Sequence, residues 1–87
     1  MRERDIEAYL VKRVKALGGE VRKVQWIGRR GAPDRLVMLP RVSVWVELKA
    51  TGVAAEPHQL REHARMRKMG QCVAVIDSVR GVEDWLT

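Results

Sequence analysis

The sequence predicts an α/β domain in which a mixed β-sheet is flanked by helices, with the element order α-β-β-β-α-β-α. Apolar residues recur at helical spacing near the N-terminus and again after residue 57, and short apolar runs typical of strands lie between and after them. The second helical pattern separates two such runs, Val44–Leu48 and Cys72–Ile76. That separation is long enough for a right-handed parallel crossover, with the helix packed on the sheet. We expect residues 1–87 to form a single domain.

The composition indicates a small basic protein with a polyanionic partner. The 87 residues include 17 Lys and Arg against 11 Asp and Glu, for a formal net charge of +6. Charge alone leaves a solvated basic surface as an alternative to such a partner. A single cysteine, Cys72, excludes an internal disulfide framework, and no apolar run approaches the ~20 residues of a membrane span. The charged N-terminus is unlike a signal peptide, so we expect a soluble intracellular protein that does not associate with membranes.

The first helix is predicted from apolar residues spaced four, four and three positions apart: Ile6, Leu10, Val14 and Leu17. Gly18 and Gly19 end this pattern. Glu7 borders the apolar stripe, so its carboxylate could lean into the domain. The simpler interpretation is a solvated glutamate paired with a neighbouring Arg or Lys.

Three strands are expected next, over residues 20–27, 35–39 and 41–50. The last two are separated by little more than Pro40, so they must pair as an antiparallel hairpin. Pro33 stiffens the preceding turn and delivers Asp34 to the mouth of the hairpin. Asp34 would then lie beside Glu47, near the end of the second arm.

The loop Gly28–Gly31 carries two arginines beside this predicted pair of carboxylates. A flexible cationic loop at that place is suited to grip a phosphate backbone. An ordinary surface turn with two exposed arginines is an equally good interpretation. The charge of the loop is therefore consistent with the site hypothesis but does not establish it.

The remaining chain is expected to add a helix, a strand and a short final helix. Helical spacing returns over residues 58–69, with a weak apolar stripe made of Leu60, Ala64 and Met66. Residues 72–76 are wholly apolar, which is typical of a strand covered on both faces. Residues 79–86 are predicted to form the last helix.

Glu47 and Lys49 project from the same face of the third predicted strand, because side chains alternate along a strand. An unpaired buried charge is expensive, so this placement favours a metal, a partner or a chemical task. With Asp34, Glu47 makes a hard-oxygen site suited to Mg²⁺ or Mn²⁺. Zinc is disfavoured because His58 and His63 are five residues apart and do not share a helical face. Lys49 could orient or deprotonate a water, or stabilise the transition state of phosphodiester hydrolysis.

These motifs resemble those of the PD-(D/E)XK nuclease superfamily. The motif from Gly31 to Arg35, the Glu-x-Lys motif from Glu47 to Lys49 and the later Gln59 are similar to its virus-type replication-repair nuclease branch, VRR-Nuc. The resemblance covers nearly the whole chain and implies a restriction-endonuclease-like core. It implies an active site formed by Glu7, Asp34, Glu47, Lys49 and Gln59. It also implies a Mg²⁺ or Mn²⁺ ion held by Asp34, Glu47, Glu7 and the backbone carbonyl of Leu48.

The expected substrate is DNA, contacted through its backbone. The chain shows no RNA-recognition signature and has no length left for reading a base sequence. Backbone contacts are expected from the basic loop, the start of the second strand and the second helix: Arg29, Arg30, Arg35, Arg61, Arg65 and Lys68.

The resemblance also implies how the DNA is cut, since stand-alone viral members are similar to Holliday-junction resolvases and act as homodimers. We therefore expect a homodimeric, structure-selective endonuclease that cuts branched DNA such as a four-way junction. A flap or nicking nuclease with specificity supplied by a partner is one alternative, and a non-catalytic DNA-binding module is another. The intact set of Asp34, Glu47 and Lys49 argues against the binding module.

Overall fold

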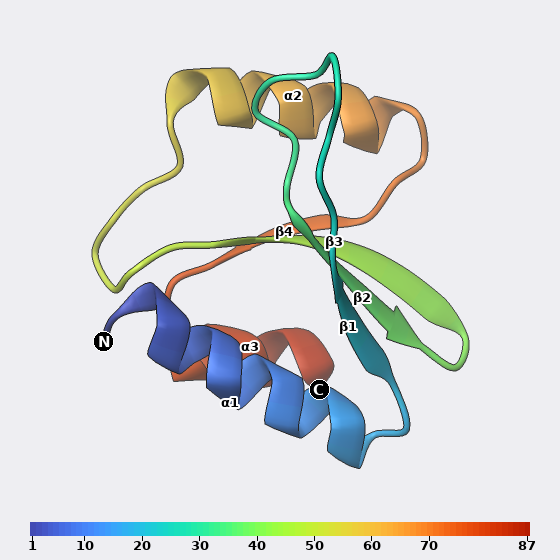
Figure 1. The fold of residues 1–87 in the computed structure, drawn as a ribbon, viewed down its shortest axis with the longest axis vertical. Coiled ribbons are helices and arrows are strands. Elements are labelled where there is room, and N and C mark those ends of the chain that lie inside the picture. Colours follow the sequence, from blue (N-terminus) through green and yellow to red (C-terminus); the bar gives the residue numbers. More distant parts are fainter.

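A computed structural model describes residues 1–87. A four-stranded sheet in the order β1-β2-β3-β4 lies between helices α1 and α3 on one side and helix α2 on the other (Figure 1). The element order α-β-β-β-α-β-α confirms the predicted mixed α/β architecture. The elements are α1 (Glu3–Ala16), β1 (Glu20–Lys23), β2 (Arg35–Leu39), β3 (Val42–Leu48), α2 (Pro57–Lys68), β4 (Val73–Ile76) and α3 (Val79–Leu86).

The sheet is antiparallel from β1 to β3 and parallel between β3 and β4. The hairpin of β2 and β3 turns at Pro40 and pairs Leu39 with Val42, as the short connection required. At its other end Arg35 pairs with Val46, and continuing that register by one residue places Asp34 opposite Glu47. The crossover from β3 through α2 to β4 forms the predicted parallel unit.

The hydrophobic core lies between the sheet and the pair α1 and α3. Alternation along β3 sends Val44, Val46 and Leu48 to this face. Helix α1 contributes the stripe that its sequence predicted, and α3 contributes Val82. The fully buried side chains from α1 are Ile6, Leu10 and Val14, which are at most 2% exposed.

Polar side chains join α1 to α3 at the margin of this core. Arg13 donates from Nε and Nη2 to the two carboxylate oxygens of Glu83, at 2.6 and 3.1 Å. The Tyr9 hydroxyl donates to the same carboxylate at 3.0 Å. Hydrogen bonds from Arg13 hold the pKa of Glu83 below its usual range. The two helices on this side are therefore fixed to each other as well as to the sheet.

The first strand is shorter than the sequence suggested. It ends at Lys23, and one further bond follows, from the Val24 amide to the carbonyl of Asp34 at 2.9 Å. The chain then leaves the sheet and rises toward α2 (Figure 1). The indole of Trp26 donates to the carbonyl of Pro33 at 2.8 Å, which closes the base of this loop. Apolar residues after Lys23 thus belong to the loop rather than to a longer strand.

The expected apolar stripe of α2 is wrong in two of its three residues. Leu60 is 51% exposed and Ala64 is exposed, whereas Glu62, His63 and Met66 are buried. The apolar stripe does not mark the buried face of α2, because the sheet face beneath this helix carries charged side chains as well as apolar ones. None of the helices is long and apolar enough to cross a lipid bilayer.

Alanine variants of Leu10 and Leu60 test whether the buried face of α1 and the exposed face of α2 are correctly assigned. Leu10→Ala removes a buried side chain from the core and should lower the free energy of unfolding by about 2–5 kcal/mol. Leu60→Ala is the matched control and should change it by less than about 0.5 kcal/mol, because that side chain is half exposed. Equilibrium urea unfolding followed by circular dichroism measures both. Equal losses would contradict the assignment of the exposed face of α2.

Candidate active site

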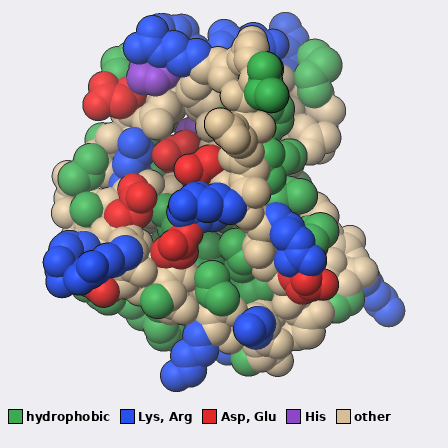
Figure 2. Space-filling model, viewed as in Figure 1, with side chains coloured by type: hydrophobic (Ala, Val, Ile, Leu, Met, Phe, Trp, Pro, Cys, Tyr) green, Lys and Arg blue, Asp and Glu red, His purple; other side chains and the backbone are tan.

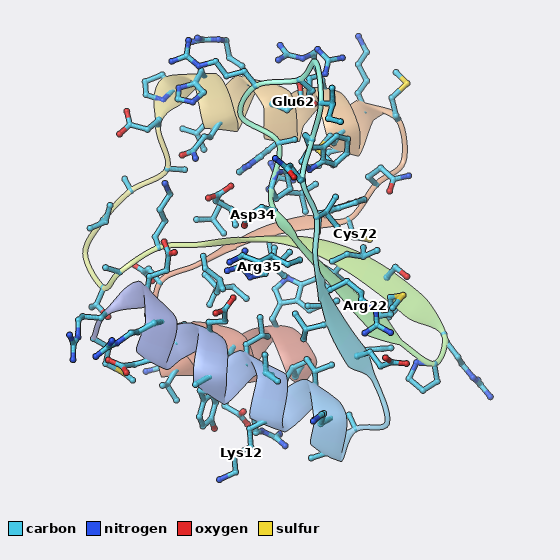
Figure 3. The ribbon with its side chains drawn as sticks, viewed as in Figure 1. Lys12, Arg22, Asp34, Arg35, Glu62 and Cys72 are labelled. Carbon is cyan, nitrogen blue, oxygen red and sulfur yellow. The ribbon has the colours of Figure 1, made fainter.

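The candidate site lies where β2 begins and β3 ends, beneath α2. Pro33 is buried just before β2 and restricts the backbone there, so that Asp34 is presented at the mouth of the hairpin. Figure 3 shows Asp34 above Arg35, between α2 and α1. Asp34 is more than half exposed, whereas Glu47 opposite is buried beside it in the sheet. One carboxylate therefore faces solvent and the other faces the protein interior.

Glu47 has a basic neighbour on each side. Its Oε2 atom lies 3.9 Å from Nζ of Lys49, and its Oε1 atom lies 3.8 Å from Nε2 of His63. Burial raises the pKa of Glu47 to about 7, Lys49 acts in the opposite direction, and the nearby carboxylate of Asp34 adds to the increase. A cation placed between the two carboxylates would relieve both their mutual repulsion and the cost of burying Glu47.

Arg35 connects two of the expected site residues from the other face of the sheet. It pairs with Val46 and so points toward α1, where its side chain is 8% exposed. Its Nε atom binds the carboxylate of Glu7, and its Nη1 atom lies 2.8 Å from Oδ1 of Asp34. The guanidinium thus holds the α1 glutamate close to the β2 aspartate. We expected Arg35 to contact DNA, whereas its side chain is buried and binds two carboxylates.

Gln59 and Leu48 are placed differently from the charged residues. Oε1 of Gln59 accepts a hydrogen bond from the Glu56 amide at 2.8 Å, in a capping box that begins α2. This bond anchors the Gln59 side chain at the helix start. Leu48 buries its side chain in the core, so that only its backbone carbonyl is available to the site.

The donor set fits a hard divalent cation. Mg²⁺ is commonly held by one or two carboxylates with water completing its shell, and Asp34 and Glu47 are adjacent carboxylates of this kind. No three His, Cys, Asp or Glu side chains converge closely enough to form a complete cage. The arrangement therefore resembles an open site for Mg²⁺ or Mn²⁺ rather than a closed structural site.

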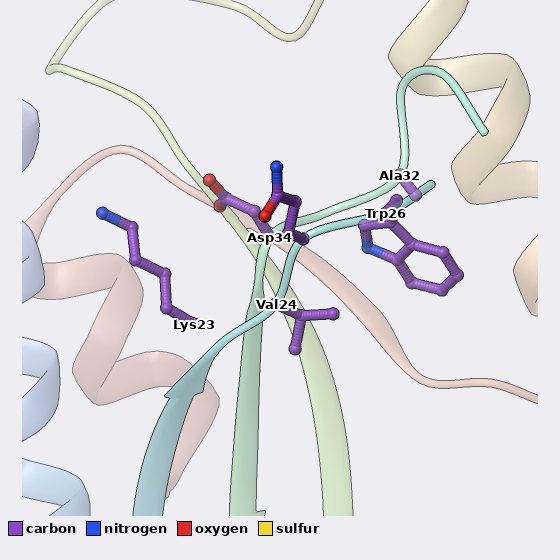
Figure 4. Close-up of a pocket in the computed structure, with 6 residues that line it drawn as sticks. Lys23, Val24, Trp26, Ala32 and Asp34 are labelled. Atoms are coloured by element: carbon purple, nitrogen blue, oxygen red, sulfur yellow. The ribbon is translucent and has the colours of Figure 1, made fainter. Parts of the chain in front are cut away.

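An open pocket of about 560 Å³ leads to Asp34. Figure 4 shows Lys23 extending on one side of Asp34, with Trp26 and Ala32 on the other. Trp26 packs on Trp45 with ring centroids 5.1 Å apart, so the pocket wall rests on the sheet. In Figure 2 acidic side chains lie in the middle of this face between basic ones, and further Lys and Arg side chains lie on α2 above them.

The basic loop packs against α2. Nε of Arg29 lies 3.4 Å from the buried carboxylate of Glu62, which also binds Arg65 at 2.8 Å. The loop packs closely on α2, since a Cβ on Gly31 would lie 2.9 Å from the carbonyl oxygen of His58. The other side chains expected to contact DNA are exposed here: Arg30, Arg61 and Lys68.

Sequence reasoning missed three residues of this site. Lys23 lines the pocket from the end of β1. His63 lies against Glu47, and its position four residues after Gln59 on one helix face could have indicated this. Glu62 anchors two arginines. Nothing in the local sequence distinguishes it from an exposed helix glutamate.

Comparisons with known proteins identify a relative and a solved structure similar to this chain. No family model matches the chain. A phage protein described as "Putative nuclease p44", from Acyrthosiphon pisum secondary endosymbiont phage 1, is 49% identical over 79 residues, covering 90% of this chain and 85% of that protein. A solved structure described as "VRR_NUC domain" superposes with a TM-score of 0.88 at 46% identity, covering 97% of this chain and 92% of its own.

Two glycines test the contact between the loop and α2. Gly31 and Gly28 both have positive φ, at +86° and +76°, so alanine should cost about 1–2 kcal/mol at either position. Gly31→Ala should cost more, because its Cβ would also meet α2, whereas Gly28 has nothing within 4 Å. Urea unfolding of both variants measures the difference. Equal destabilisation would show that the loop does not rest on α2.

Proposed function

Because the chain belongs to the VRR-Nuc family of PD-(D/E)XK nucleases, we propose that it is a Mg²⁺- or Mn²⁺-dependent endonuclease that cuts branched DNA as a homodimer. The observation that carries this proposal is the pairing of Asp34 with the buried Glu47, with Lys49 beside them. Family membership makes the chain a nuclease. The metal, the DNA structure and the dimer are the proposed parts.

Each site residue has a distinct task in the proposed mechanism. Asp34, Glu47 and the backbone carbonyl of Leu48 would hold the ion, which supplies an activated water and neutralises charge on the scissile phosphate. Lys49 lies 3.9 Å from Glu47 and can orient that water or stabilise developing negative charge. Arg35 keeps Glu7 beside Asp34, so that the glutamate can position a water on the same edge. Gln59 would act from the first turn of α2, where its Oε1 atom caps the helix.

The basic rim is suited to a backbone contact with DNA. Arg30, Arg61 and Lys68 are exposed on the loop and on α2. Phosphate contacts orient a duplex without selecting a sequence, so selectivity would follow from the shape of the substrate. Two copies related by a two-fold axis would present two sites to a symmetric junction.

Removing either carboxylate should abolish cleavage. Asp34→Asn or Glu47→Gln should slow the nicking of a four-way junction in Mg²⁺ by at least about a hundredfold, because several kcal/mol of transition-state stabilisation depend on the ion. The reaction is followed on denaturing gels with end-labelled strands. Asp84→Asn on α3 is the control, since that carboxylate is exposed and paired only with Arg80. Undiminished cutting by both site variants would refute the proposed metal site.

The DNA structure and the oligomeric state are tested together. We expect paired nicks on opposite strands of a four-way junction, faster cutting of that junction than of a flap, a splayed arm or a linear duplex, and a dimeric mass by light scattering. Activity should fall steeply as salt is raised, because backbone contacts release counterions. Single unpaired nicks from a monomer would instead support a nicking or flap nuclease that obtains specificity from a partner.

A further inference from the structure

His63 is a buried polar residue with no hydrogen bond. Its side chain is fully buried on α2, and neither Nδ1 nor Nε2 has a partner. Burying unpaired polar atoms costs free energy, and most buried polar atoms in folded proteins are satisfied. A leucine would fill a similar volume without that cost. The stability of α2 therefore does not explain why an imidazole stands here.

The groups around His63 identify the side chain with which its imidazole can interact. Its Nε2 atom lies 3.8 Å from Oε1 of Glu47, while Oε2 of the same carboxylate faces Lys49. The neighbouring acceptor on α2, Glu62, is already bound by Arg65. Gln59 is engaged in the helix cap. The carboxylate of Glu47 is thus the partner that His63 faces.

We propose that His63 is a positioning residue, which donates a hydrogen bond from Nε2–H to Oε1 of Glu47 and so orients this carboxylate toward the cation. The inference rests on the proposed metal-dependent function. The bond forms when the two atoms approach by about 0.8 Å, to the usual N–H···O separation near 3.0 Å. The two side chains already face each other between β3 and α2, with these atoms 3.8 Å apart.

A neutral imidazole is sufficient for this task. Burial lowers the pKa of His63, and the neighbouring Arg67 acts in the same direction. The tautomer with a proton on Nε2 donates one hydrogen bond and adds no charge to the site. Groups that hydrogen-bond a metal-ligating side chain fix its orientation, and their loss commonly weakens metal binding by 10–100-fold. No proton needs to move for His63 to act.

The test compares two substitutions with opposite expectations. His63→Leu removes the donor, and His63→Gln keeps an N–H donor near the same place. We expect His63→Leu to unfold at the same or a higher temperature than the wild type without metal, yet to bind Mn²⁺ about tenfold more weakly by titration calorimetry. His63→Gln should bind Mn²⁺ within about threefold of the wild type. Met66→Leu, also buried on α2, is the control and should leave Mn²⁺ affinity unchanged.

The outcomes separate this inference from the proposed function. If His63→Leu binds Mn²⁺ as the wild type does, or unfolds at a much lower temperature, His63 is a packing residue and the inference fails. The metal site stands in that case, provided that Glu47→Gln abolishes binding. If the wild type binds no Mn²⁺, or if Glu47→Gln binds it equally well, the proposed metal site fails and the role of His63 fails with it.

Discussion

Burying the carboxylate of Glu47 costs free energy, and much of the surrounding structure can be understood as a response to that cost. The residue stands in β3, covered by α2, with its pKa raised to about 7. Lys49 offsets part of the burial cost, whereas Asp34 increases it. Such an arrangement is unfavourable for a side chain that serves only the fold, and a cation joining the two carboxylates would offset its cost.

The two faces of the sheet differ in their side chains. The face toward α1 and α3 is apolar and contains the core, while the face toward α2 carries Glu47, which His63 of α2 contacts. Arg35 is the exception that links them, since it lies on the core side and binds Asp34 at the mouth of the hairpin. A small domain can therefore keep a charged site without breaking its core, because the charges lie across the sheet from it.

Sequence patterns predicted those features of the fold that depend on residues close together in the chain. The short turn at Pro40 forced an antiparallel hairpin, and the register of that hairpin then placed Glu47 opposite Asp34. The buried face of α2 could not be found in this way, because hydrophobic periodicity assumes that a helix covers an apolar surface. The burial of Arg35 depends on Glu7, 28 residues earlier in the chain. The shortened β1 depends on a bond from Trp26 to Pro33 within the loop.

The ion pairs of Glu62 affect how the protein meets an anionic partner. Arg29, on the loop, and Arg65, on α2, share this buried carboxylate, which holds their side chains in place where a phosphate would otherwise do so. Both arginines are held by Glu62 before any ligand arrives, so little side-chain freedom would be lost on contact. Their positive charge is also partly neutralised already, and fewer condensed ions are displaced when they reach a phosphate. The net charge of the chain therefore overstates how many of its cations act as free electrostatic contacts.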